Sequence, residues 1–131
     1  MPKWGLNTGR GATHFEEKRY RNNNTAVPEF VWYNEAGWLP GVCATSRISY
    51  YLCCTQAGTG GQVKVLIKWT DNSATVQELE TATINTNVLG DVTSGDFLTH
   101  STPGTNITCE VIVIGGPTGY KYDLFLHAEH M

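Results

Sequence analysis

The sequence predicts an all-β domain, an antiparallel β-sandwich of the jelly-roll type with an extended N-terminal arm. Two observations predict the sandwich. From residue 29 onward, short segments repeat the alternation of apolar and polar residues that is typical of half-buried strands. Fourteen glycines and five prolines among 131 residues supply turns between these segments. Seven or eight short strands without a helical segment are typical of two packed sheets.

The strands are expected in the following order. Residues 29–33 form a short aromatic strand, and residues 47–55 and 62–70 alternate most clearly. Further strands are expected at residues 75–84, 85–89, 95–100, 106–114 and 120–129, with turns at residues 71–73, 103–104 and 115–119. The apolar phase of these strands predicts a core made of Ile48, Tyr50, Leu52, Val63, Val65, Ile67, Val111, Leu124 and Leu126.

The N-terminal segment differs from the rest of the chain. Residues 1–28 show neither the strand nor the helix period, and they predict an extended arm ahead of a sandwich domain at residues 29–131. The arm holds five basic and two acidic side chains, whereas residues 29–131 hold four basic and ten acidic ones. A basic arm on an acidic body favours docking on a negative surface. A solvated tail and a short helix at residues 15–21 are the alternatives.

Aromatic residues in the arm favour the docking interpretation, because disordered tails usually lack them. Aromatic side chains and arginines are also the residue types that most often anchor interfaces. The candidate partner-binding residues are therefore Trp4, Arg10, Phe15, Arg19, Tyr20 and Arg21.

Several classes of function have little support in the sequence. No apolar run approaches the ~18 residues of a membrane helix, and no secretory signal pattern is present, so the four cysteines are expected to be reduced. Cys53 and Cys54 should point to opposite faces of one strand. The acidic body argues against nucleic-acid binding.

An enzyme is also not expected. No zinc-protease helix, nucleophile elbow or phosphate-binding loop occurs, so we expect no catalytic residue, no metal site and no cofactor. Glu78 and Glu80 are two residues apart on one strand face, which is more typical of a solvated edge than of a pair of catalytic carboxylates.

Four segments, in the same order, resemble strands of small β-structured virion proteins of tailed bacteriophages. They are RISYYL (47–52) after AGW (36–38), VLIKWTD (65–71), GTNIT (104–108) and YKYDLFLHAE (120–129). Two departures stand out: Cys109 lies where that group usually has tyrosine, and residues 39–46 are an insertion before the RISYYL strand. The arm is outside the resemblance.

The resemblance implies a protein that is made in the host cytoplasm and resides in the virion. We expect a capsid decoration protein whose arm binds the major capsid protein, because no repeated fibre shaft is present. Related jelly rolls of the tumour-necrosis-factor and complement type imply a homotrimer. The alternative is a receptor- or carbohydrate-binding domain of a tail or head fibre, with Trp32, Tyr33 and Trp38 stacking on sugars unless they fill the core.

Overall fold

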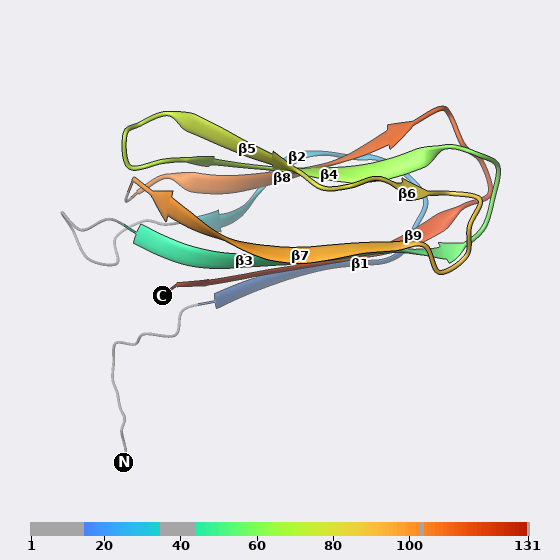
Figure 1. Ribbon diagram of the computed structural model, residues 1–131, viewed down its shortest axis with the longest axis horizontal. Helices are drawn as coiled ribbons and strands as arrows, with labels where there is room; N and C mark the ends of the chain where they lie inside the picture. The colour runs from blue at the N-terminus through green and yellow to red at the C-terminus, as the bar shows by residue number, and fades with distance from the viewer. Residues whose placement is uncertain (1–14, 35–43, 103, 131) are drawn as a thin grey trace, which may run out of the picture.

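Two antiparallel sheets packed face to face form the structure (Figure 1), a computed structural model that describes residues 15–34, 44–102 and 104–130. Sheet A has the strand order β1 (Phe15–Asn23), β9 (Lys121–His130), β3 (Ala44–Gln56) and β7 (Val92–Ser101). Sheet B has the order β2 (Val27–Asn34), β8 (Asn106–Ile114), β4 (Gln62–Thr70) and β5 (Val76–Glu80), and β6 (Ile84–Asn85) also pairs with β4. The predicted β-sandwich is confirmed.

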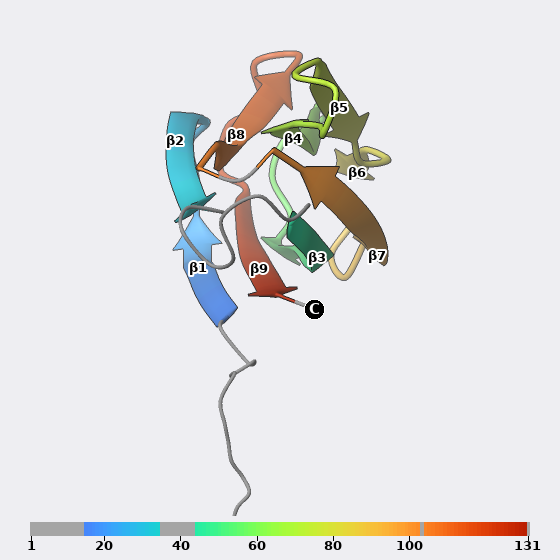
Figure 2. The ribbon, with the colours of Figure 1, turned by 90° about the vertical axis from the view of Figure 1, so that its left-hand side faces the viewer.

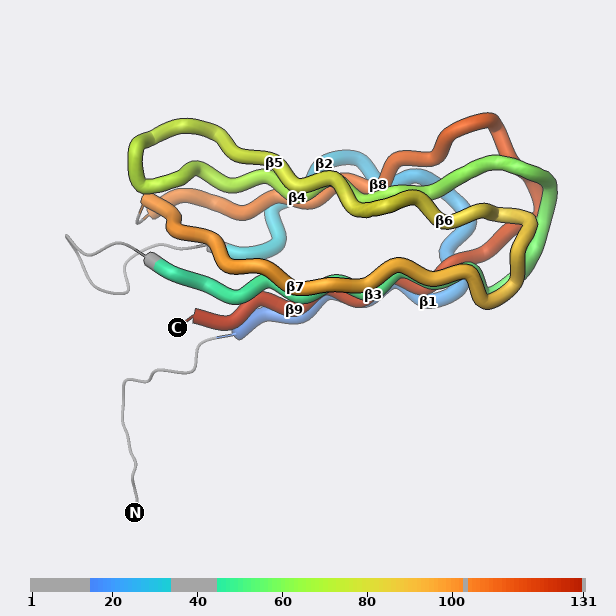
Figure 3. The backbone as a smooth tube through the Cα atoms, viewed as in Figure 1, coloured from blue at the N-terminus to red at the C-terminus, as the bar shows by residue number. Residues whose placement is uncertain are grey.

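The connectivity is that of a jelly roll. Consecutive strands lie in different sheets, except that β4, β5 and β6 all lie in sheet B (Figure 3). β5 and β6 are two halves of one edge strand beside β4, interrupted at Thr81. Thr81 N donates to the Val65 carbonyl at 2.9 Å, and the Thr81 hydroxyl accepts from Val65 N at 3.0 Å. With β5 and β6 counted as one edge strand, four strands pack on four, the arrangement of a jelly roll.

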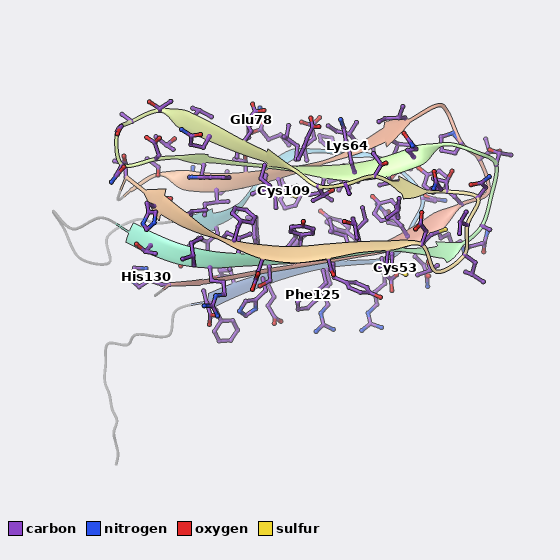
Figure 4. The ribbon with its side chains drawn as sticks, in the orientation of Figure 1. Cys53, Lys64, Glu78, Cys109, Phe125 and His130 are labelled. Atoms are coloured by element: carbon purple, nitrogen blue, oxygen red, sulfur yellow. The ribbon has the colours of Figure 1, made fainter. Side chains whose placement is uncertain are left out.

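The core lies between the sheets and contains the residues that alternation predicts. Eight of the nine predicted core side chains are buried, and Tyr50 is half-buried. Trp32, Tyr33 and Tyr122 add large aromatic rings to the same cluster. Cys109 also lies between the sheets (Figure 4), and burial raises the pKa of its thiol to about 12. The predicted division of Cys53 and Cys54 between two faces is confirmed, because Cys54 is buried and Cys53 is half-buried.

The N-terminal segment differs from its prediction. Residues 15–23 are not an arm or a helix but the edge strand β1, which pairs with β9 in the register Phe15↔Glu129 to Asn23↔Tyr122 (Figure 2). The alternation fails here because Glu16 and Lys18 occupy the inward phase of the strand at the sandwich rim, and inward charges are typical of protected edges. The boundary predicted at residue 28 is therefore wrong, since both β1 and the start of β2 precede it. Residues 1–14 lie outside the described residues.

Smaller differences concern strand ends. The strand predicted at residues 75–84 is divided between β5 and β6, residues 86–90 are turns rather than a strand, and the strand predicted at residues 95–100 is the longer β7. In β2 the register against β8 shifts between Val31 and Tyr33. This shift places Trp32 and Tyr33 both in the core, although they are consecutive.

Three loops are joined tightly at one end of the sandwich. Gly58 N donates to the Thr86 carbonyl at 2.8 Å, and Thr59 N donates to the Thr118 carbonyl at 2.9 Å. A Cβ on Gly58 would overlap the Thr118 carbonyl oxygen, and a Cβ on Gly61 would lie 2.7 Å from the Pro117 ring. The β3–β4 loop therefore packs against the β8–β9 loop with no room for a side chain at either glycine.

Candidate binding surface

The outer face of sheet A is the candidate binding surface. It consists of the side chains of β1, β9, β3 and β7 that point away from sheet B, and Figure 4 shows Phe125 among them. Phe15, Tyr51, Val92 and Leu98 on this face are each between 46% and 53% exposed. Scattered exposed apolar residues are ordinary, but four on one sheet face with a half-buried phenylalanine among them favour a contact surface.

Tyr51 and Phe125 form the centre of this face. They are direct cross-strand neighbours on β3 and β9, with Arg19 on the β1 side and Ser94 on the β7 side. A depression of about 330 Å³ lies on the β1 side, lined in part by Arg19, Arg21 and Asp123. The two aromatic rings therefore border a depression that is also lined by charged side chains.

A second depression, of about 390 Å³, lies on the β7 side of the same pair. Ser49, Ser94 and Asp96 supply its polar groups, and Tyr51 and Phe125 line it as well. An interaction with the Cys53 side chain raises the pKa of Tyr51 above its ordinary value. The Tyr51 phenol is therefore neutral at physiological pH and can both donate and accept a hydrogen bond.

The charged groups on this face are held mainly by local contacts. The Arg19 guanidinium lies 4.6 Å from the centre of the Phe125 ring, a cation–π arrangement. Asp123 accepts a hydrogen bond from Asn22 N at 2.7 Å, where Asn22 has a φ of 50° in the irregular end of β1. These contacts orient Arg19 and Asp123 at the rim of the first depression.

Toward the other end of the face the charges are paired. Glu17 lies 3.3 Å from His127 Nδ1, and the His127 ring stacks on Phe15 with centres 5.6 Å apart. Arg47 and Glu129 are 3.9 Å apart. Ion pairs this exposed contribute little to stability, but they balance the charge of the face, so it is mixed rather than basic.

The structure brings some of the predicted partner-binding residues together and separates others. Phe15, Arg19 and Arg21 lie on the outer face of sheet A. Tyr20 points inward instead: its ring meets Phe30 edge-on at 6.0 Å, and burial raises its pKa. Tyr20 is therefore half-buried against the core rather than on the outer face, and its role as a docking residue stays a prediction. Trp4 and Arg10 lie outside the described residues.

Tyr51 and Phe125 are the residues that sequence reasoning missed. Both occupy the polar phase of strongly alternating strands, beside Ser49 and Cys53 in one case and Asp123 and His127 in the other. An aromatic residue on the phase that faces solvent is a usable signal, because burial does not explain it. Two such residues on different strands can be recognised as neighbours only once the pairing of β3 with β9 is known.

The other aromatic candidates are part of the interior. Trp32 is 8% exposed and Tyr33 is 1% exposed, so both fill the core as the alternative interpretation predicted. Trp38 lies outside the described residues. Glu78 and Glu80 are exposed on the edge strand β5, and Glu80 lies 3.2 Å from Lys64. The prediction that these two carboxylates lie on a solvated edge is confirmed.

Metal ligation, membrane insertion and thiol pairing are three further possibilities for these residues. In the part of the chain that the structure describes, no three His, Cys, Asp or Glu side chains are grouped so that they could hold a metal ion. No described segment forms a helix long and apolar enough to span a membrane. Cys53, Cys54 and Cys109 are free thiols, and Cys43 is outside the described residues.

Comparison with protein-family models gave no match for this chain, and comparison with curated proteins gave none either. The resemblance to small virion proteins thus remains a hypothesis from four sequence segments. The jelly-roll arrangement is a property of the structure itself.

Proposed function

We propose that the protein is a decoration protein of a tailed-bacteriophage capsid, and that the outer face of sheet A binds the major capsid protein. The observation that carries the binding surface is the outward-facing pair of Tyr51, which is exposed, and Phe125, which is half-buried, bordered by Arg19 and by two polar depressions. The virion assignment comes from the resemblance of the four sequence segments. Trp4 and Arg10, which lie outside the described residues, are proposed as further contacts.

The face has the composition of a protein-binding surface. Tyrosine, phenylalanine and arginine contribute large contact areas and concentrate binding energy. Its charges are mixed and include Arg19, Asp96 and Asp123, which suits a partner surface that carries both signs. Salt should therefore weaken binding only in part, because the aromatic contacts do not depend on ionic strength.

Stabilisation of the shell then follows from mass action. A protein that binds only the assembled lattice adds a free energy of RT ln(1 + [L]/Kd), which reaches about 2.7 kcal/mol at one hundred times Kd. No chemical step is required for this activity.

Capsids assembled without the protein provide the test. Purified protein is added, and the bound fraction is measured by co-sedimentation. Tyr51→Ala should raise Kd at least about tenfold, the cost typical of an anchoring aromatic residue, and Arg19→Ala should raise it less. Val31→Ala is the matched control, because Val31 is 58% exposed on sheet B.

Two results would contradict the proposal. Equal binding by Tyr51→Ala and the wild type would place the contact elsewhere on the domain. Density for the protein only at the tail in images of the complete particle would exclude decoration.

A second candidate is a carbohydrate-binding domain of a fibre. It is favoured by the depression on the β7 side, where two aromatic rings lie beside Ser49, Ser94 and Asp96. Aromatic faces suit sugar rings, and serine and aspartate side chains suit sugar hydroxyls. A glycan array separates the candidates: specific binding that Phe125→Ala abolishes supports the fibre domain, and no binding to any glycan argues against it.

A further inference from the structure

Sheet edges expose unpaired backbone groups, and three of the four edges of this sandwich carry features that block pairing. β1 has charged side chains and a register shift between Tyr20 and Asn23. β2 contains Pro28 and two register shifts. The edge made by β5 and β6 is interrupted after Glu80. Charges, proline and irregular pairing are the usual protections of an exposed edge.

The fourth edge, β7, has none of these protections. It pairs with β3 over ten consecutive residues without a register shift, contains no proline and carries one charged side chain other than histidine, Asp96. Figure 2 shows β7 at the opposite border of sheet A from β1. Within the described residues no strand of sheet A pairs with its other side. Val92 and Leu98 are each 48% exposed on this edge.

The direction of the free backbone groups follows from the register. Cys54 N donates to the Asp91 carbonyl at 2.8 Å, and bonded and non-bonded pairs alternate along an antiparallel ladder. The odd-numbered residues of β7 therefore bond to β3, and the amide and carbonyl groups of the even-numbered residues point away. The free stretch ends at His100, whose carbonyl accepts from Asn72 N at 3.0 Å.

We propose that β7 pairs with β7 of a second copy of this chain, antiparallel about a two-fold axis at Gly95, to join two sheets A into one continuous sheet. In this register Val92 lies opposite Leu98 of the second copy, and Ser94 lies opposite Asp96. Each of these residues directs its amide and carbonyl toward the partner strand, so the backbone groups form a complete ladder.

Side-chain complementarity selects this register and this occupant. The four side chains lie on the outer face, so the pairing places aliphatic on aliphatic and hydroxyl on carboxylate at symmetry-related positions. A shift by two residues in one direction centres the axis on Ser94 and sets Val92 against Asp96. A shift in the other direction centres it on Asp96 and opposes two carboxylates. In a two-fold dimer each copy provides Leu98 opposite Val92 and Asp96 opposite Ser94 at both ends of β7. An unrelated strand would have matching residues at these positions only by coincidence.

The two-fold contact is distinct from the three-fold association that the sequence resemblance implies, and it does not depend on the proposed capsid function. It leaves the centre of the outer face open, because Tyr51 and Phe125 lie on β3 and β9 rather than on the edge. The dimer would present two such centres side by side, and therefore bind a repeating surface with two attachment points.

Sedimentation equilibrium of the full chain tests the proposal. The wild type should show a monomer–dimer equilibrium. Leu98→Glu should raise the dimer dissociation constant at least about tenfold, because each dimer sets the introduced carboxylate against Val92 of the second copy twice. Leu98 neighbours Arg47 across the β3–β7 ladder, so the glutamate is compatible with the monomer. Val76→Glu is the matched control, since Val76 is 60% exposed on the edge strand of sheet B.

Ser94→Lys tests the register by the sign of its effect. In the proposed register the ammonium group introduced on each copy faces Asp96 of the second copy, so dimerisation should strengthen. With the axis at Ser94 the two introduced ammonium groups would face each other, and dimerisation should weaken. A monomeric wild type at the highest soluble concentration, a trimer insensitive to Leu98→Glu, or a weaker dimer of Ser94→Lys would each overturn the proposal.

Discussion

The hydroxyl of Tyr122 fixes the corner between β1 and β2, and Tyr122→Phe tests this role. The ring is fully buried, and the hydroxyl donates to the Thr25 carbonyl at 2.7 Å and accepts from the Asn23 side-chain amide at 2.8 Å. Each hydrogen bond contributes about 0.5–1.5 kcal/mol net. Asn23 is half-buried and Thr25 is exposed, so in the variant water can replace part of the lost hydrogen bonding. We therefore expect a loss of about 1–2 kcal/mol.

The assay is urea unfolding at pH 7, followed by circular dichroism and tryptophan fluorescence. At this pH the phenol is neutral, because burial raises the pKa of Tyr122 to about 12. In thermal unfolding, the melting temperature should fall by about 3–6 °C for each kcal/mol lost from the free energy of unfolding in a chain of this size. Tyr120→Phe is the control: Tyr120 stacks on Tyr122 with centres 6.4 Å apart, but its hydroxyl has no hydrogen bond to a described residue. Equal stability of the two variants would refute the reasoning.

Three further predictions concern stability. Leu124→Ala should cost about 2–5 kcal/mol in urea unfolding, since Leu124 is 1% exposed, and a loss below about 1 kcal/mol would mean that the site relaxes to fill the cavity. Burial raises the pKa of Cys109 to about 12, so its neutral thiol contributes stability that is fully present below pH 9 and is lost as pH rises through about 12. Between pH 8 and 10.5 the free energy of unfolding of the wild type should therefore fall by about 2 kcal/mol more than that of Cys109→Ala. Parallel pH profiles of the two proteins would contradict this. Deletion of residues 1–23 should lower the melting temperature because it removes β1, whereas deletion of residues 1–14 leaves every described strand in place and should not.

The sequence predicts strands and their core residues wherever one face of a strand is buried and the other is exposed to solvent. Ile67 and Leu126 lie in strands with this contrast, and both are in the core as predicted. The contrast is lost in β1, whose inward phase carries Glu16 and Lys18, so a strand there is indistinguishable from an arm by periodicity. Alternation also fails at Trp32 and Tyr33. A register shift in β2, which no local sequence pattern predicts, places both side chains in the core.

The candidate site was predictable only in part for a different reason. Arginine and phenylalanine in residues 15–21 predict a contact surface, and Arg19 and Phe15 lie on the outer face of sheet A, the candidate surface. Its centre depends on the pairing of residues 51 and 125, which are far apart in the chain. Such long-range neighbours are set by strand order, and strand order is not encoded in any single segment.

The tight packing of the β3–β4 and β8–β9 loops restricts which sequences can adopt this structure. Because side chains at positions 58 and 61 would collide with backbone or with the Pro117 ring, a homologue with the same loop lengths must have glycine at both positions. The strands, by contrast, accept any residues that keep the alternation. Descent from a common ancestor would therefore remain visible in two glycines and a proline at this end of the sandwich, after the strand sequences had diverged beyond recognition.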